Sequence, residues 1–349
     1  MKPACGFVVA GHPGQCTGGY RYDAEIVSGL RALGWRVDVS GLPGRFPVVD
    51  GTARRALDAC LRAHAPGTQV VIDGLALGGL PEVATAHARR LAITALVHHP
   101  LADESGLASA TRATLFASEQ AALACARSVV TTSRFTARRL ADFGVAAERI
   151  HVVEPGAAAA ALAPADRRAP HMLCVATLVP RKGHTVLVEA LGRLRDHAWT
   201  CELVGSLSRD PAQARAVADA IEAAGLRDKI GLVGELSPSA LQERYLNADV
   251  FVLPSLYEGY GMVVTEALAH GLPVITTTGG ALIDTVPASA GIAVAPGDAG
   301  QLGSALRRFL EDDTLRRTLR AGARAARGRL DDWASASARF AHALAQTRS

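Results

Sequence analysis

Short apolar runs alternate with longer amphipathic stretches along most of the chain. The run at 6–11, GFVVAG, ends in glycine, as buried parallel strands often do before a loop. Ile26, Leu30 and Leu33 then recur at helical spacing. Residues 36–42, RVDVSGL, have the composition of a second strand. This order of strand, glycine-containing loop, helix and strand predicts a βαβ unit.

The same alternation continues to the end of the chain and predicts an open α/β fold with parallel sheets. Helical stretches lie between most of the apolar runs, for example at 185–195 and 212–224. We interpret further apolar runs as strand-like. They are 69–77, 92–100, 128–133, 149–156, 171–178, 200–207, 229–236, 248–255, 272–280 and 291–298.

A segment rich in alanine and proline at 156–170 has no hydrophobic stripe and interrupts this pattern. We therefore predict two Rossmann-like, doubly wound domains at 1–160 and 171–330, joined by a linker at 161–170. Such sheets bind ligands at the carboxyl ends of their strands, and two of them facing each other would form a central cleft.

Composition narrows the class of protein without naming a function. Hydrophobic residues make up 49% of the 349 residues, enough for a large core, and a net charge of +4 is too small to predict a nucleic-acid partner. No apolar run approaches the roughly 18–20 residues of a membrane span, and the N-terminal run is shorter than that of a signal peptide. We expect a cytoplasmic protein and leave open peripheral contact with the inner membrane face. Cysteines at scattered positions without C-x-x-C spacing indicate reduced, buried thiols: Cys5, Cys16, Cys60, Cys125, Cys174 and Cys201.

The segment 255–275, SLYEGYGMVVTEALAHGLPVI, carries the clearest chemical signal. Its loop follows a predicted strand, so the helix expected over 261–270 begins at the carboxyl edge of the sheet. A helix N-terminus there favours an anion such as phosphate, and glycines let the backbone approach it closely. Glu258 and Glu266 would then accept hydrogen bonds from hydroxyl groups on either side of a diphosphate. A molecule of that kind is a nucleotide sugar.

The segment EGYGMVVTEALAHGLPVI resembles the E-x7-E signature of the retaining glycosyltransferases of family 4, which have the GT-B fold. The resemblance extends over nearly the whole chain. It implies two Rossmann-like domains facing a central cleft, and a C-terminal helix over 331–349 that returns to the first domain. Four further segments resemble the family in the same order along the chain: 17–37, 128–145, 175–191 and 276–286.

The resemblance also implies roles for individual residues. Glu266 would bind the ribose of the nucleotide, and Glu258 would lie beside the hydroxyls of the donor sugar. Lys182 would pair with the diphosphate and stabilise the leaving nucleotide. Backbone groups near the sugar and the phosphates would come from Gly18, Gly19, Gly259, Tyr260, Gly261 and Met262.

The chain departs from the family pattern at one cation. Thr177 stands where the family has an arginine. Arg181, beside Lys182 in the PRKG segment, is the candidate to replace it. A histidine near the reacting face of the donor sugar is also expected after a strand, and either His98 or His99 matches it.

These implications predict a retaining hexosyltransferase that uses a nucleotide-diphosphate sugar, with a UDP-sugar as the commonest expectation. No cofactor is expected, and no metal, because a convincing Asp-x-Asp motif is missing. The acceptor, a small molecule, lipid or glycan, stays open, as does the oligomeric state, and Arg21, Tyr22 and Arg134 are candidate acceptor contacts. A nucleotide-sugar epimerase and a non-catalytic nucleotide-sugar-binding protein remain alternatives. A dinucleotide-dependent dehydrogenase is disfavoured, because GHPGQCTGG does not fit G-x-G-x-x-G.

Overall fold

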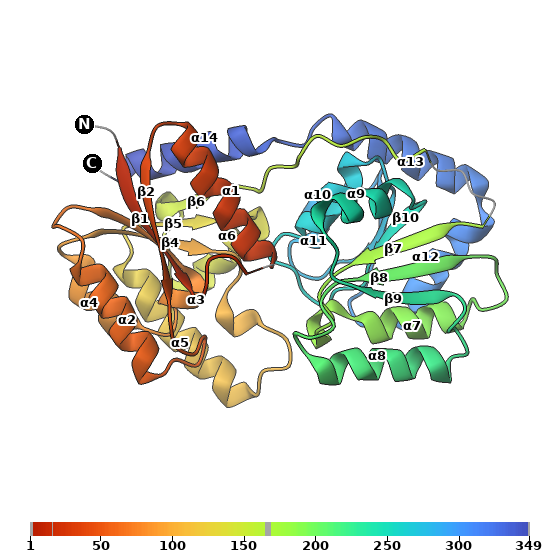
Figure 1. Cartoon of the computed structure of the whole chain (residues 1–349), viewed down its shortest axis with the longest axis horizontal. Coiled ribbons are helices and arrows are strands. Elements are labelled where there is room, and N and C mark those ends of the chain that lie inside the picture. The colour runs from red at the N-terminus through yellow and green to blue at the C-terminus, as the bar shows by residue number, and fades with distance from the viewer. Residues whose placement is uncertain (1–2, 16, 165–168, 348–349) are drawn as a thin grey trace. The chain divides into compact units, whose positions relative to one another are not determined.

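The computed structural model describes residues 3–15, 17–164 and 169–347. The chain divides into two compact units, one formed by residues 1–156 with 331–349 and the other by residues 157–330 (Figure 1). Each unit contains a six-stranded sheet. The predicted α/β class is confirmed. Of the predicted linker, residues 165–168 lie outside the described residues, as does Cys16.

The first sheet is parallel with strand order β2-β1-β3-β4-β5-β6. β1 is the first strand in sequence, and it pairs with β2 on one side and with β3 on the other. The direction in which successive strands are added to the sheet therefore reverses between β1 and β3. Doubly wound sheets bind ligands at the carboxyl ends of the strands beside such a reversal. The strands are β1 (Ala4–Ala10), β2 (Arg36–Leu42), β3 (Gln69–Asp73), β4 (Ala92–Val97), β5 (Ser128–Thr131) and β6 (Ile150–Val152).

Helices cover both faces of this sheet (Figure 1). On one face α14 packs against α1, and Gly29 permits their close approach because a Cβ there would lie 2.4 Å from the Cβ of Ser337. The Asp332 carboxylate caps α14 by accepting a hydrogen bond from the Ser335 N–H. The helices are α1 (Gly18–Ala32), α2 (Gly51–Arg62), α3 (Gly74–Leu77), α4 (Pro81–Ala88), α5 (Ser109–Cys125), α6 (Arg134–Arg139) and α14 (Trp333–Gln346).

The second sheet is also parallel, with strand order β12-β11-β10-β7-β8-β9. Its winding reverses between β7 and β10, which lie side by side although they are far apart in sequence. The loops that follow these two strands are therefore the expected ligand position in this unit. The strands are β7 (His171–Val175), β8 (Thr200–Val204), β9 (Ile230–Gly234), β10 (Val250–Leu253), β11 (Val274–Thr277) and β12 (Gly291–Val294).

Both faces of the second sheet are buried, which explains the continuous apolar runs of its strands. In β10, Val250 and Val252 join one hydrophobic cluster, whereas Phe251 and Leu253 join the other. This alternation follows from the two-residue period of a strand. The helices that cover the two faces are α7 (His184–Gly192), α8 (Pro211–Ala223), α9 (Pro238–Leu246), α10 (Met262–Ala269), α11 (Leu282–Thr285), α12 (Ala299–Glu311) and α13 (Asp313–Arg327).

Two local expectations need correction. The run 69–77 is a strand only to Asp73, because that carboxylate accepts a hydrogen bond from the Leu75 N–H and starts α3. Cys60 and Cys125 are only half-buried, whereas Cys5, Cys174 and Cys201 are buried. Within the described residues, the helices are too short or too polar to span a membrane.

Candidate functional site

Two loops meet at the winding reversal of the second unit. The loop after β7 contains a 3₁₀ turn, Pro180–Lys182, and the loop after β10 leads into α10. The Leu256 N–H donates to the Arg181 carbonyl over 2.8 Å and ties the loops together. Gly183 has φ +67°, and a Cβ there would lie 2.2 Å from the Pro254 carbonyl oxygen. Only glycine allows this approach.

Arg181, Lys182 and Glu258 converge at this meeting point. Lys182 Nζ donates to Oε1 of Glu258 over 2.5 Å, and Arg181 lies 3.5 Å from Oε2. Ser255 donates its hydroxyl to the same Oε1 over 2.6 Å. The Lys182 and Arg181 side chains are both 17% exposed, and that of Glu258 is 8% exposed. The cluster therefore brings two cations and one carboxylate together at a partly exposed position.

Burial and neighbouring charges shift the pKa values of Glu258 and Lys182 in opposite directions. Burial would raise the pKa of the Glu258 carboxyl, but the charges of Lys182 and Arg181 lower that pKa to about 2. Burial also lowers the pKa of the Lys182 ammonium, and its attraction to Glu258 opposes this. The Glu258 carboxylate is ionised at neutral pH and holds the lysine and the arginine in place.

We expect Glu258→Gln to flatten the acid dependence of stability. The pKa of Glu258 falls from an ordinary 4.5 to about 2 on folding. Its contribution to the free energy of unfolding is thus fully present above pH 4.5 and is lost as the pH falls toward 2. Urea unfolding of wild type and variant between pH 6 and 2.5 measures the two slopes. If the free energy of unfolding has the same pH dependence in wild type and variant, the pKa of Glu258 does not shift on folding. Glu189→Gln, which changes a side chain 63% exposed, serves as the control.

The start of α10 is open to an anion. Its first residue is Met262, and Gly261 before it has φ +91° and provides no side-chain cap. The first N–H groups of a helix without such a cap are available to a ligand. The loop is held from behind, because the Glu258 carbonyl accepts from the Ala281 N–H over 2.8 Å and the Tyr260 carbonyl accepts from the Thr285 hydroxyl over 2.8 Å. Residues 259–262 thus form a fixed rim around the helix start.

Glu266 lies further along α10, half-buried. Its Oε2 accepts a hydrogen bond from the Tyr245 hydroxyl over 2.9 Å. Tyr245 is fully buried and stacks on His270, with ring centroids 5.0 Å apart. The Glu266 carboxylate is therefore oriented by a rigid aromatic pair. Neither Tyr245 nor Ser255 was among the residues expected from sequence, since no motif marks their hydrogen bonds.

Thr177 and Arg181 lie on the same loop after β7. The Thr177 carbonyl accepts from the Val179 N–H over 2.8 Å and shapes the turn that precedes Arg181. Arg181 Nη1 donates to the Tyr257 carbonyl over 2.7 Å and reaches toward the carboxylate of Glu258. Adjacent residues often point apart, but this turn brings the guanidinium of Arg181 and the ammonium of Lys182 to the same carboxylate.

In the first unit, the structure separates the two candidate histidines. Nε2 of His98, just after β4, lies 3.1 Å from Oδ1 of Asp23 and 3.4 Å from Oδ2 of Asp73. Nε2 of His99 instead lies 3.5 Å from Glu104. Burial would lower the pKa of the His98 imidazole, but the two aspartates raise it to about 10. Burial raises the pKa of the Asp23 carboxyl to about 6, against the attraction of His98.

Gly18 and Gly19 are the first two residues of α1, and Gly19 lies against the ring of His98. A Cβ on Gly19 would be 3.2 Å from Cδ2 of His98, so the glycine lets the ring pack on the first turn. Tyr22 is not available to an acceptor as expected, because it is 1% exposed and its hydroxyl donates to the Val153 carbonyl. It packs edge-on against His98 instead, with ring centroids 5.3 Å apart.

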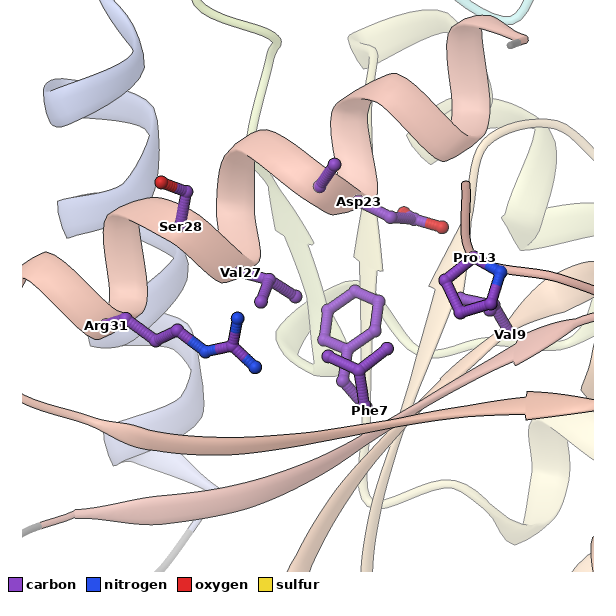
Figure 2. Close-up of a pocket in the computed structure, with 9 residues that line it drawn as sticks. Phe7, Val9, Pro13, Asp23, Val27, Ser28 and Arg31 are labelled. Carbon is purple, nitrogen blue, oxygen red and sulfur yellow. The ribbon is translucent and has the colours of Figure 1, made fainter. Parts of the chain in front are cut away.

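Asp23 also lines a cavity of about 430 Å³ in the first unit (Figure 2). The cavity lies beside α1, β1 and β2, with Phe7 and Val27 on its walls and Arg31 reaching into it. Its lining is mainly apolar. Asp23 and Asp73 were not singled out from sequence. The signals were present, since Asp73 ends a strand and Asp23 lies one helical turn after Gly19.

Asp23, Asp73 and His98 form the single grouping of three carboxylate, thiol or imidazole ligands within 4.8 Å of one another in the described part of the chain. Their contacts are those of an N–H donor between two carboxylates, with distances in the hydrogen-bond range. We interpret the grouping as a hydrogen-bonded cluster. The loops around Glu258 offer cations and backbone N–H groups, which suit a phosphate.

Two family descriptions match the chain. Glycosyltransferase Family 4 matches residues 17–160, and Glycosyl transferases group 1 matches residues 163–326. The MMP alpha-(1->4)-mannosyltransferase of Mycolicibacterium hassiacum is 30% identical over 57% of this chain and 49% of its own length. The D-inositol 3-phosphate glycosyltransferase 1 of Catenulispora acidiphila is 31% identical over 70% of this chain and 62% of its own length. The chain thus spans about half to three fifths of these curated relatives.

Solved structures show the same fold over nearly the full chain. The sucrose-phosphate synthase of Thermosynechococcus elongatus aligns with a TM-score of 0.81 at 21% identity and covers 98% of both chains. HepE of Anabaena, solved in complex with UDP-glucose, aligns with a TM-score of 0.75 at 16% identity and covers 98% of this chain and 99% of that one. With its two parallel sheets and the two family matches, the chain belongs to the family 4 glycosyltransferases with the GT-B fold.

Proposed function

We propose that the chain is a retaining glycosyltransferase that transfers a hexose-type sugar from a nucleotide-diphosphate sugar to an acceptor hydroxyl. The observation that carries this proposal is the convergence of Arg181 and Lys182 on Glu258 beside the uncapped start of α10. The two neighbouring cations and the helix N-terminus suit a diphosphate. A carboxylate in the same cluster suits the hydroxyls of a sugar attached to it.

In this reaction the bond between the anomeric carbon and the diphosphate oxygen breaks, and a bond to the acceptor oxygen forms on the same face. Negative charge grows on the leaving diphosphate, so contacts from Lys182 and from the N–H groups of α10 strengthen in the transition state. The leaving phosphate takes the proton of the acceptor hydroxyl. Glu266, held by Tyr245, accepts from the ribose hydroxyls.

The cations replace a metal ion in this proposal. Arg181 supplies the positive charge that the family has at the position of Thr177, and its contact with Glu258 supports that role. His98 is the histidine that we propose for the donor sugar, because it is fixed by neighbouring carboxylates, whereas His99 pairs with the more exposed Glu104. UDP is the first nucleotide to test, since HepE was solved with UDP-glucose.

The direct test is thermal unfolding with UDP, GDP and ADP and their common sugar conjugates. A ligand at about 100 times its Kd stabilises the folded state by about 2.7 kcal/mol. We expect one diphosphate and its sugar conjugate to raise the unfolding temperature, and the matching nucleoside, which lacks phosphates, to have little effect. That nucleotide then identifies the donor for a screen of acceptors, with the anomeric configuration of the product read by NMR.

The outcomes separate the alternatives. If none of the nucleotides stabilises the protein, the donor site is absent and the proposal fails. Binding of a nucleotide sugar without transfer to any acceptor would favour a non-catalytic binding protein. Conversion of the sugar without an acceptor would identify an epimerase, and an inverted product would exclude the retaining mechanism.

A further inference from the structure

The imidazole of His98 is held on several sides within the first unit. Nε2 lies between Asp23 from α1 and Asp73 from the end of β3, at 3.1 and 3.4 Å. The Tyr22 ring meets it edge-on, and Gly19 lies against Cδ2. Both aspartates are almost fully buried, at 5% and 6% exposure. A ring enclosed in this way has one orientation.

Each carboxylate is itself fixed. Oδ1 of Asp73 accepts from the Leu75 N–H over 2.8 Å at the start of α3, which leaves Oδ2 directed at His98. Asp23 lies one turn after Gly19 on α1, so both face the same ring. The two carboxylates therefore define where the Nε2 proton lies.

The other ring nitrogen has a different environment. Among the described residues, Nδ1 of His98 has no hydrogen-bond partner, and the side chain is 19% exposed. The charged and titratable groups that face the ring are Asp23 and Tyr22 from α1 and Asp73 from β3. Arg339 from α14 acts on Tyr22. Two carboxylates beside one nitrogen favour a second proton on the ring.

We propose that Asp23 and Asp73 are positioning residues that hold the Nε2–H of His98 between them and keep the ring an imidazolium, so that Nδ1–H is presented as a donor to an oxygen atom of the bound sugar substrate. The identity of that substrate rests on the proposed function. The ring then cannot remove a proton from the acceptor. It fixes a hydroxyl of the sugar and places a positive charge beside it.

The state of the ring can be measured without turnover. In protein labelled with ¹⁵N-histidine, the nitrogen resonances distinguish an imidazolium from either neutral tautomer, and His98→Gln identifies the resonance among those of eleven histidines. We expect His98 in the wild type to be doubly protonated at pH 8, where an unperturbed histidine is neutral. In Asp73→Asn and Asp23→Asn we expect it to lose that proton at a pH lower by about 1 to 3 units.

Asp58→Asn is the matched control. His87 is another buried histidine in the same unit, and its Nε2 lies 2.8 Å from Oδ1 of Asp58. The variant removes the negative charge of this partner. This variant should leave the His98 resonance unchanged. A neutral His98 at pH 8 in the wild type overturns the proposal, and that measurement needs no variant to fold. An unchanged resonance in both folded aspartate variants also overturns it, as does a stoichiometric metal ion whose removal by EDTA shifts the His98 signals.

Kinetics provide the second measurement. In the aspartate variants, kcat/KM for the donor should fall above the pH at which their His98 loses its proton, whereas in the wild type it should hold to higher pH. If the two aspartates had a purely structural role, their substitution would lower kcat/KM equally at all pH values. If no transfer is ever found but the imidazolium is observed, the proposed function fails while the role of the two aspartates stands.

Discussion

Lys182→Ala is expected to lower kcat/KM for the nucleotide-sugar donor by about 100- to 1,000-fold, the range found when one preorganised donor is removed from a developing negative charge. Lys182 is the nearer of the two cations in the loop cluster, 2.5 Å from Glu258. Its attraction to the diphosphate grows as the leaving group departs, so most of the loss should appear in kcat. Initial rates of nucleoside diphosphate release measure it.

Stability must be measured beside activity for this variant. Removing one member of a buried ion pair costs about 3–5 kcal/mol when the other charge is left unpaired. Here Arg181 remains 3.5 Å from Glu258 and limits that cost. Lys229→Ala is the control, because Lys229 precedes β9 at the opposite edge of the sheet and lies over the Trp199 ring. A folded Lys182→Ala protein with wild-type kcat would contradict the proposed role.

Glu258→Gln is expected to separate nucleotide binding from turnover. The glutamine keeps the size of the side chain but removes the negative charge that Arg181 and Lys182 share. The affinity for the nucleoside diphosphate should therefore stay the same or increase, because both cations lose a competing partner. Turnover should fall by about 10- to 100-fold, the equivalent of one lost hydrogen bond from a sugar hydroxyl to a charged acceptor.

Calorimetric titration of the diphosphate and initial rates with its sugar conjugate give the two quantities. Loss of affinity with unchanged kcat would indicate that Glu258 only organises the loops and takes no part in turnover. Ser255→Ala is a useful companion. It removes the hydroxyl that donates to Oε1 of Glu258 while leaving both cations and the charge of the carboxylate in place.

The secondary structure was largely readable from the sequence because local pattern carries it. The strand predicted at 36–42 is β2, with the same bounds. The helix expected over 261–270 is α10, which is one residue shorter at each end because Gly261 and His270 are its caps. The run at 69–77 was less well predicted, since its last residues are as apolar as a strand and only the cap at Asp73 turns them into α3.

The sequence pointed to part of the candidate site. The spacing of Glu258 and Glu266 and the PRKG segment were visible in the sequence. The choice between His98 and His99 was not, because neighbouring residues at a strand end point in different directions and only packing decides which of them meets the carboxylates of Asp23 and Asp73.

The sequence by itself determined the α/β class, the position of the glycine-rich loop before α10 and the residue types that suit a nucleotide sugar. The tertiary structure alone decided that Lys182 and Arg181 share one carboxylate, 76 and 77 residues further along the chain. That meeting depends on β7 pairing with β10 and on Gly183 letting the two loops approach. Strand order is a property of the whole sheet, and no local pattern of polar and apolar residues encodes it.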